Sequence, residues 1–405
     1  MLLRGGAENV LSTITDQFPI STVYWNRRYE PDIIARDTRL KKRLREEGLT
    51  VETFNSALLY EPHEISNKSG QPFRVFTPFW KHLRSLPQRG PTHVDTRTLS
   101  PATLDLGSLD LAALDLLPKI HWDAGLQAAW DPSIAGGIKA LESFVNEHAE
   151  RYKAERNLPG VNGTSRLSPY LHFGQLGPRQ VWDATVRAEL DSSPGGFTFL
   201  SEVAWREFGY HLLYHFPHTP ADALNSTYKN FPWVPDAQQL HAWQTGMTGY
   251  PIVDAGMREL WQTGWMHNRV RMITASFLVK HLLQPWQEGA RWFWDTLVDA
   301  DLASNTMGWQ WTAGCGADAA PYFRIFNPML QGDKFDPEGQ YVRRYIPELS
   351  ALPNRYIHQP WEAPGSTLSK AGVTLGREYP ERIIDHKVGR DRALAALQTN
   401  KSRHD

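Results

Sequence analysis

The sequence predicts an α/β unit near the N-terminus, followed by a linker and a large all-helical region. Two runs rich in β-forming residues, Ser21–Trp25 and Thr50–Phe54, flank a charged helical stretch over Glu30–Glu47. Gly48 follows that stretch, as glycine often follows the last turn of a helix. Strand, helix and strand in this order predict a βαβ unit with a parallel sheet. Because Met1–Arg4 also resembles a strand, we expect the unit to be part of a larger sheet whose preceding strands are missing.

The rest of the chain is mostly helical in its pattern. We expect the α/β unit to span 1–87, a linker rich in Pro, Thr, Leu and Asp to span 88–135, and the helical region to span 136–405. No internal repeat and no low-complexity tract interrupts this order. The segments with the clearest helical pattern are Gly136–Arg156, Pro178–Leu190, Phe197–Phe216, Tyr250–Thr263, Trp265–Leu283 and Ala290–Leu297.

Composition narrows the class of protein without identifying it. The chain has 405 residues, of which 41% are hydrophobic and 21% charged, values typical of globular proteins. No apolar run approaches the roughly 18 residues that a membrane span needs, and no signal-peptide pattern is present, so we expect a cytoplasmic protein without a membrane partner. A single cysteine, Cys315, excludes a disulfide framework and a four-cysteine metal site.

The net charge and the number of tryptophans do not identify the binding partner of the protein. The formal net charge of −1 does not favour nucleic acid, but DNA binding depends on a local basic surface and not on the whole-chain charge. The chain contains 16 tryptophans, which can be core, interface or stacking residues.

The segment Gly163–Pro169 has the residues of a phosphate site. Hydroxyls, free backbone N–H groups and Arg166 precede a predicted helix for which Ser168 is a suitable N-cap and Pro169 a suitable first residue. The alternative is a capped helix with a solvated arginine.

Two predicted helices carry mixed polar and aromatic faces. Glu202, Trp205 and Arg206 are spaced to share one face, as a pocket wall or as an exposed ion pair beside a core tryptophan. Further along, Asn268, Arg271 and Met272 share a face from which Arg269 points away, while we interpret His267 as structural. Asn can pair with a base edge, Met gives an adaptable apolar contact, and Arg suits phosphates.

Asp299 and Asp301 stand two residues apart, ahead of Asn305, Trp309 and Trp311. Two carboxylates suggest a metal site, but no His or Cys cluster accompanies them, so a loop or helix-cap role is the alternative. The residues alone therefore indicate a helical, Trp-rich binder of a cofactor or a nucleotide.

Taken together, the motifs resemble the photolyase/cryptochrome family over almost the whole chain. The runs that carry the resemblance are GTSRLSP (163–169), WREF (205–208), TGYPIVDA (248–255), GWMHNRVRM (264–272), DADLASN (299–305), GWQW (308–311) and DAAPYFRIFNP (318–328). The resemblance implies a partial Rossmann-like antenna domain over 1–87, an interdomain linker and a helical FAD-binding catalytic domain over 136–405.

In this family the helical domain holds FAD in a folded form. Carried over by motif, Arg271 would pair with Asp299 beside the isoalloxazine, and Asp301 and Asn305 would lie at the flavin edge, with Asn305 near N5. Phe199 stands where the enterobacterial member has Trp. The remaining residues that the resemblance assigns to the FAD site are Tyr152, Thr164, Ser165, Arg166, Leu167, Ser168, Glu202, Arg206 and Asn268.

The resemblance also implies a substrate and a mechanism. A pyrimidine dimer flipped out of damaged DNA would enter a pocket and receive an electron from excited reduced flavin. The implied catalytic pocket comprises Glu202, Trp205, Asn268, Met272 and Trp311. Arg269 and Arg324 would hold phosphates, and an electron relay would run through Trp309, Trp286 and Trp233.

Within the family, the residues favour a monomeric, bacterial class I-like photolyase acting on cyclobutane pyrimidine dimers. The main alternative is a cryptochrome, against which stand Asn305, Trp311 and the absence of a long tail after the last predicted helix. A six-four photolyase is the second alternative, and that branch has His at the positions of Asn268 and Met272. The single cysteine excludes the iron–sulfur branch, and no Gly-x-Gly-x-x-Gly motif supports a dinucleotide-dependent dehydrogenase.

The antenna is left unassigned. Family members begin with further strands, so the chain is expected to be N-terminally shortened by about half of the antenna domain. Asp32-Ile33 replaces the Asn-Glu pair associated with folate in one branch. A second chromophore of the folate or deazaflavin type therefore stays possible but unassigned.

Overall fold

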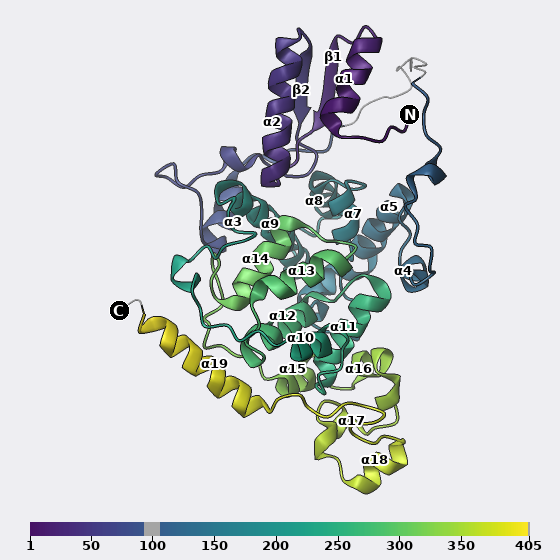
Figure 1. Ribbon diagram of the computed structural model, residues 1–405, viewed down its shortest axis with the longest axis vertical. Helices are drawn as coiled ribbons and strands as arrows, with labels where there is room; N and C mark the ends of the chain where they lie inside the picture. Colours follow the sequence, from purple (N-terminus) through teal and green to yellow (C-terminus); the bar gives the residue numbers. More distant parts are fainter. Residues whose placement is uncertain (93–105, 404–405) are drawn as a thin grey trace.

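The computed structural model describes residues 1–92 and 106–403, and Figure 1 shows a small α/β unit above a large helical body. The unit contains α1 (Ala7–Gln17), β1 (Thr22–Asn26), α2 (Pro31–Glu46) and β2 (Thr50–Phe54). The two strands are parallel, with Thr22 opposite Thr50 and Asn26 opposite Phe54. The predicted strand–helix–strand unit is confirmed, and its sheet has two strands in the described chain.

Hydrophobic side chains hold this unit together. Leu40 and Leu44 of α2 pack with Val51 of β2, and Leu11 of α1 and Val23 of β1 pack against the same cluster. The alternating burial along β2 places Val51 inward and its neighbours outward, as expected of a strand covered on one face.

Two features of the N-terminal region differ from the predictions. Met1–Arg4 is not a strand, because it is irregular and its Leu2 hydrogen-bonds the linker at Ser108 and Leu109 instead of a strand. The helix α1 was not predicted; its N-cap, Gly6, gives no side-chain cap. The predicted linker 88–135 lies partly outside the described residues; its described part holds short helical elements, including α4 (Ala124–Ala129), and α5 already begins at Ile134 within it.

The remaining chain is helical, as predicted. Tertiary packing sets the helix bounds more than local propensity does, since most of these helices are too short to persist alone. Their bounds are α3 (Phe76–Ser85), α5 (Ile134–Ser143), α6 (Tyr152–Glu155), α7 (Ser168–Phe173), α8 (Pro178–Arg187), α9 (Pro194–His215), α10 (Ala237–Gln244), α11 (Pro251–Thr263), α12 (Asn268–Ser276), α13 (Trp286–Thr296), α14 (Leu302–Ala313), α15 (Pro328–Phe335), α16 (Gln340–Tyr345), α17 (Asn354–Ile357), α18 (Gly365–Ala371) and α19 (His386–Lys401).

Some predicted helices have different bounds in the structure. The stretch predicted as Gly136–Arg156 is divided into α5, a π-helical turn at Phe144–His148 and α6. The stretch predicted as Trp265–Leu283 begins only at Asn268, because His267 is the N-cap and its Nδ1 accepts a hydrogen bond from the Arg269 N–H at 3.1 Å.

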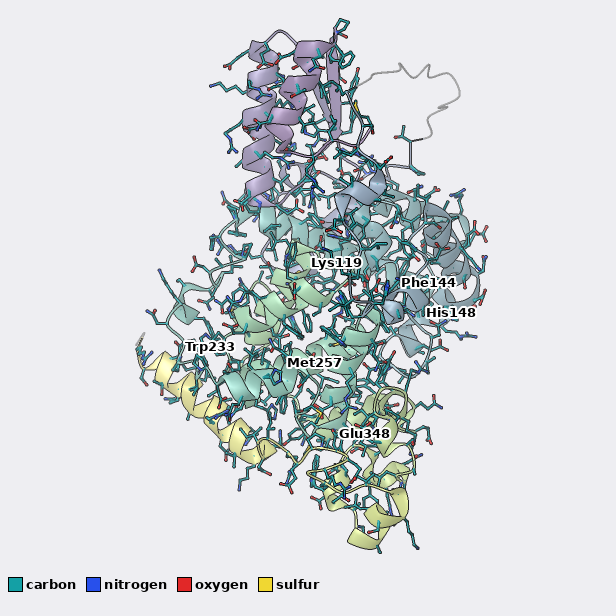
Figure 2. All side chains as sticks on the ribbon, turned by 45° about the vertical axis from the view of Figure 1, so that its right-hand side comes forward. Lys119, Phe144, His148, Trp233, Met257 and Glu348 are labelled. Carbon is teal, nitrogen blue, oxygen red and sulfur yellow. The ribbon has the colours of Figure 1, made fainter. Side chains whose placement is uncertain are left out.

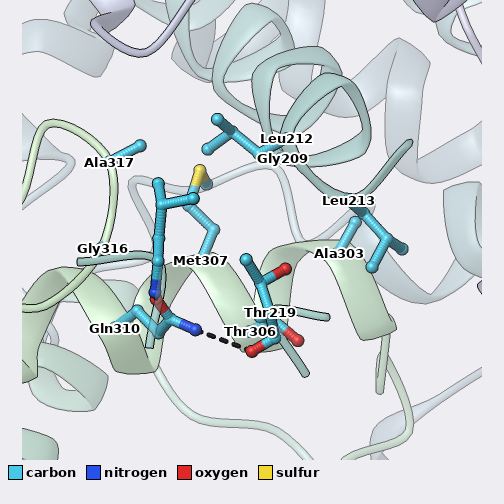
Figure 3. A pocket seen from close by; sticks show the side chains of 11 residues that line it. Gly209, Leu212, Leu213, Thr219, Ala303, Thr306, Met307, Gln310, Gly316 and Ala317 are labelled. Carbon is cyan, nitrogen blue, oxygen red and sulfur yellow. Dashed lines mark hydrogen bonds between the residues drawn. The ribbon is translucent and has the colours of Figure 1, made fainter. Parts of the chain in front are cut away.

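The longest helix, α9, is a core helix on which the site is built. Ser193 caps it, because its hydroxyl oxygen accepts a hydrogen bond from the Gly196 N–H at 3.0 Å, and Pro194 occupies the first position of the helix. Its buried residues lie on several sides of the helix, so it is enclosed by its neighbours. Between α9 and α14 lies a small apolar cavity of about 20 Å³, lined by Gly209, Ala303 and Met307 among others (Figure 3). That volume has room for about one water molecule.

Among the described residues, no helix is both long and apolar enough to cross a lipid bilayer.

Candidate functional site

Three helices bring together most of the side chains that the sequence singled out. Helix α14 packs against both α9 and α12, so residues far apart in the chain meet around it. These side chains are Glu202, Trp205 and Arg206 on α9, Asn268, Arg271 and Met272 on α12, and Asn305, Trp309 and Trp311 on α14.

An ion pair joins α12 to the segment before α14. Arg271 donates from Nη2 to Asp299 Oδ2 at 2.8 Å and from Nε to the Met266 carbonyl at 2.7 Å. Asp299 is buried, and its second oxygen, Oδ1, has no hydrogen-bond partner. Because Asp299 is paired with a guanidinium, the Asp-x-Asp pattern forms an ion pair and a helix cap instead of a two-carboxylate metal site.

Asp301 is that helix cap. Its Oδ1 accepts from the Ser304 N–H at 2.7 Å, which starts α14. Its other oxygen accepts a hydrogen bond from the Tyr210 hydroxyl. Burial, followed by the Asp301 charge, raises the pKa of Tyr210 well above its usual value, so this phenol stays a neutral donor.

Arg206 and Asn305 are anchored to the backbone near this cap. The Arg206 guanidinium lies 4.7 Å from the Tyr210 ring centroid, and its Nη1 donates to the Ala57 carbonyl at 2.6 Å. The Asn305 amide donates to the Ala290 carbonyl of α13 at 2.9 Å. Both side chains are thereby tied to the backbone of neighbouring segments.

The segment Gly163–Pro169 differs in part from its prediction. Helix α7 begins at Ser168, and its N-cap is Leu167 without a side-chain cap, so the expected N-cap role of Ser168 is wrong. Arg166 is not a solvated side chain either, because its guanidinium lies 4.5 Å from the Trp130 ring and 5.0 Å from the Trp265 ring. Arg166 has a left-handed backbone with φ +51°, a strained conformation that is common at ligand sites.

A second part of the site lies where α6 meets α9. The Tyr152 ring packs edge-on to Phe199, with centroids 5.6 Å apart, and burial raises the pKa of Tyr152. Arg156, one turn after Tyr152, donates to Glu202 Oε1 at 2.6 Å. Burial raises the pKa of the Glu202 carboxyl, and the Arg156 charge opposes that rise. The sequence reasoning missed Arg156; its only signal was the one-turn spacing from Tyr152.

The expected pocket residues have accessible or partly accessible side chains. Trp205 is half-buried and stacks on Phe76 with ring centroids 3.8 Å apart and planes at 10°. Met272 and Trp311 are half-buried, and Asn268 is exposed at the first position of α12. This combination of flat apolar faces with a free amide and a carboxylate suits a planar polar ligand.

The two expected phosphate-binding arginines have different surroundings. Arg269 donates to Asn157 Oδ1 at 2.8 Å and lies 4.5 Å from the Phe335 ring, so part of its guanidinium is occupied. Arg324 is exposed and forms no ion pair with any other described residue. Its carbonyl accepts from the buried Lys280 ammonium at 2.8 Å, which anchors the Arg324 backbone.

The three expected relay tryptophans lead from the interior to the edge of the helical body. Trp309 is buried, and its ring lies against Gly289 of α13, one turn after Trp286. Trp286 is also buried, whereas Trp233 is half-buried. Figure 2 shows Trp233 near the edge, beside α19. The rings nearest Trp309 are Phe293, at 5.0 Å, and Trp243, at 6.1 Å.

Comparison with known proteins identifies the kind of cofactor that the helical body binds. Residues 199–399 match the sequence model described as the FAD-binding domain of DNA photolyase, and residues 1–97 match the model described as DNA photolyase. The helical body is therefore an FAD-binding domain, and the protein is a flavoprotein.

The relatives identify the family. The chain is 48% identical over 403 residues to a deoxyribodipyrimidine photo-lyase of Agrobacterium fabrum, covering 99% of this chain and 84% of that protein. It is 40% identical to cryptochrome-1 of Arabidopsis thaliana, covering 93% of this chain and 56% of that protein. The crystal structure of a bacterial class III photolyase from Agrobacterium tumefaciens superposes with a TM-score of 0.95 at 48% identity, covering 98% of this chain and 83% of that one. The chain belongs to the photolyase/cryptochrome family.

The subclass expected from the sequence is not confirmed. The bacterial class I-like prediction rested on individual motif residues, whereas the structure at TM-score 0.95 is that of a class III photolyase.

The residues present fit an FAD molecule. Three buried polar atoms around the site have no partner in the described protein, namely Arg166 Nε, His267 Nε2 and Asp299 Oδ1. Buried polar groups are nearly always hydrogen-bonded, so unpartnered atoms gathered at one site indicate a polar ligand. Guanidinium groups and hydroxyls suit phosphates, and a buried carboxylate suits the N–H edge of a flavin ring.

Proposed function

We propose that this protein repairs cyclobutane pyrimidine dimers in DNA by light-driven electron transfer. The observation that carries the proposal is the meeting of two sets of residues around α14, one suited to a flavin and one suited to a flipped-out pyrimidine dimer. Family membership adds independent support, because a relative with 48% identity is a deoxyribodipyrimidine photo-lyase. In this proposal residues 1–87 are the antenna domain, 88–135 the linker and 136–405 the catalytic domain.

The proposed FAD site combines the anchored charges described above. Arg271 and Asp299 would face the isoalloxazine, and Asp301 and Asn305 would lie at its edge. Bound FAD, in its reduced and excited form, supplies the electron that opens the dimer. The protein holds fixed dipoles around that group, so little reorganisation is needed when charge moves. The other residues proposed to hold it are Tyr152, Thr164, Ser165, Arg166, Leu167, Ser168, Phe199, Glu202, Arg206 and Asn268.

The proposed dimer pocket uses a polar and an apolar side. A dimer stacked inside a duplex cannot reach an interior cofactor, so it must be flipped out. Glu202 and Asn268 would hydrogen-bond the carbonyl and imide edges, while Trp205, Met272 and Trp311 would pack against the rings and methyl groups.

The ion pair with Arg156 positions the Glu202 side chain. Arg156 holds the Glu202 carboxylate at 2.6 Å, which keeps its oxygens in one orientation in a mostly buried environment. A six-four lesion needs proton transfer, which neither Asn268 nor Met272 performs, so the pocket favours cyclobutane dimers.

The proposed relay runs from Trp309 through Trp286 to Trp233. An electron passing inward along these indoles would restore the reduced flavin after oxidation. We further propose that Arg324 and Arg269 bind phosphates, that the protein acts as a cytoplasmic monomer, and that it belongs with the class III photolyases.

The experiment is a repair assay on oligonucleotides that carry either a cyclobutane dimer or a six-four product, in light and in darkness. We expect repair of the cyclobutane dimer alone, and only in light. A protein with flavin absorption that repairs neither lesion would instead be a light sensor of the cryptochrome kind. Equal repair of both lesions would refute the pocket assignment.

Glu202→Ala tests the pocket directly, with Glu142→Ala on the exposed face of α5 as the matched control. Loss of one hydrogen bond to a charged group costs about 1.5–3 kcal/mol, so Glu202→Ala should weaken dimer binding roughly tenfold to hundredfold. Glu142→Ala should change nothing. Trp309→Phe should abolish photoreduction of oxidised flavin while chemically reduced enzyme still repairs.

A further inference from the structure

A cavity opens at the outer end of the proposed relay. Its volume is about 370 Å³, which is within the range of small-molecule sites. Trp286 and Trp233 both line it, and so does Tyr228. Since Trp286 is 2% exposed overall, the cavity is the place where a solute comes close to this otherwise buried indole. Two of the three proposed relay residues thus share one solvent-open wall.

The polar groups of the cavity favour an anion. Lys229 and Arg291 line it, with Asp222 as the single lining carboxylate, so the lining carries one net positive charge. Lys229 is exposed and has no ion pair with another described residue, while Arg291 is paired with Glu288. The cation available to a solute is therefore Lys229.

The start of α13 adds donors to the same wall. Pro285, Trp286 and Gln287 line the cavity at the N-terminus of this 11-residue helix. The backbone N–H groups of Trp286 and Gln287 form no hydrogen bond within residues 1–92 and 106–403. Free N–H groups and the helix dipole attract negative charge at this end. Burial raises the pKa of Tyr228, so its hydroxyl remains a neutral donor.

We propose that this cavity binds a small organic anion that reduces the relay, a thiolate or an enediolate. This inference rests on the proposed relay. In the reaction, one electron passes from the bound anion to the oxidised Trp233 indole, which returns to its neutral form. A thiolate becomes a thiyl radical; an enediolate monoanion loses one electron and one proton, and the proton passes to Asp222 or to solvent. The anion is held against the indoles by Lys229 and the start of α13.

Ascorbate, an enediolate monoanion at neutral pH, is the probe, and uncharged hydroquinone is its neutral counterpart. Flash photolysis of the FAD-loaded protein follows the decay of the tryptophan radical as the reductant concentration rises. The cavity predicts a decay rate that saturates with ascorbate and rises linearly with hydroquinone, because only the anion binds before it reacts.

Lys229→Glu, with Lys387→Glu on the exposed start of α19 as its control, separates local from whole-molecule charge. Both variants change the net charge equally. We expect Lys229→Glu to lower the rate at low ascorbate concentration about tenfold and to remove saturation, with the hydroquinone rate unchanged. Lys387→Glu should behave as the parent protein.

The outcomes distinguish the cavity from the relay. A linear ascorbate dependence in the parent protein, or equal rates in the two variants, would overturn the cavity proposal while leaving the relay intact. Absence of any tryptophan radical in the parent protein would overturn the relay, and the cavity proposal with it.

Discussion

Gly289→Ala would test how α13 holds Trp309. A Cβ atom at position 289 would lie 2.0 Å from Cη2, 2.4 Å from Cζ3 and 2.5 Å from Cζ2 of the Trp309 indole. Non-bonded carbons approach only to about 3.5 Å, so the ring would have to move by roughly 1 Å or more. Trp309 is buried beside Phe293 and Trp243, and these rings would have to move with it.

The magnitude follows from two opposing effects. Overpacking a well-filled core costs about 1–3 kcal/mol, whereas alanine in a helix interior gains about 1 kcal/mol over glycine. We therefore expect Gly289→Ala to lower the free energy of unfolding by up to about 2 kcal/mol. The displaced indole should also slow photoreduction of the flavin, since electron transfer depends on the separation of the rings.

Two other helical glycines serve as matched controls. At Gly308, beside Trp309 on α14, a Cβ would meet no atom within 4 Å. At Gly209 on α9 the nearest atoms would be 3.5 Å away, next to the small cavity of Figure 3. Both substitutions should raise the free energy of unfolding by up to about 1 kcal/mol. Urea denaturation measures the stabilities, and flavin absorbance under blue light measures photoreduction. If Gly289→Ala matched Gly308→Ala in both measurements, the packing of Trp309 on Gly289 would be refuted.

Three further predictions concern charge. Arg324→Ala should reduce the slope of log affinity for dimer DNA against log salt by about one unit, and an unchanged slope would place Arg324 outside the interface. Burial lowers the pKa of His211 to about 3, so the folded protein stays unprotonated there while the unfolded chain binds a proton below about pH 6.5. The free energy of unfolding should therefore fall as the pH decreases from 6.5 to 4.5. In urea denaturation, the His211→Gln variant should lose up to about 2.7 kcal/mol less unfolding free energy over this range than the parent protein does. Arg271→Ala should cost about 3–5 kcal/mol because it leaves the buried Asp299 charge unpaired, whereas Asp299→Ala should cost less because the Arg271 side chain is 24% exposed. The double variant should cost clearly less than their sum, and strict additivity would show that the pair is not coupled.

The sequence predicted the elements whose signals are local. The strand β2 has the predicted bounds, and α2 differs by one residue at each end, because alternation, charge pattern and a following glycine all lie within the segment. The prediction of a strand over Met1–Arg4 was wrong because strand formation depends on a partner that is not local. A strand needs a neighbouring strand, and in the structure this segment hydrogen-bonds the linker at Leu109.

The candidate site was predictable as a set of residue types, but its contacts were not. The pairing of Arg271 with Asp299 came from the family resemblance, and the structure has it at 2.8 Å. The Arg156–Glu202 pair joins residues 46 positions apart, and no local pattern connects them. Likewise, the left-handed backbone of Arg166 and its position between two tryptophans depend on packing of the linker and of the chain before α12.

The distribution of charge explains why a net charge of −1 says little about DNA binding. In the site, Arg156 and Arg271 are each paired with a carboxylate, so their charges are compensated close by and contribute little field outside the protein. Such pairs keep the local dipoles fixed for chemistry. Attraction of a phosphate backbone must then come from cations without an acidic partner, of which Arg324 is one. The salt dependence of binding therefore depends on the number of exposed, unpaired cations. The whole-chain charge also includes paired groups that do not contact the DNA.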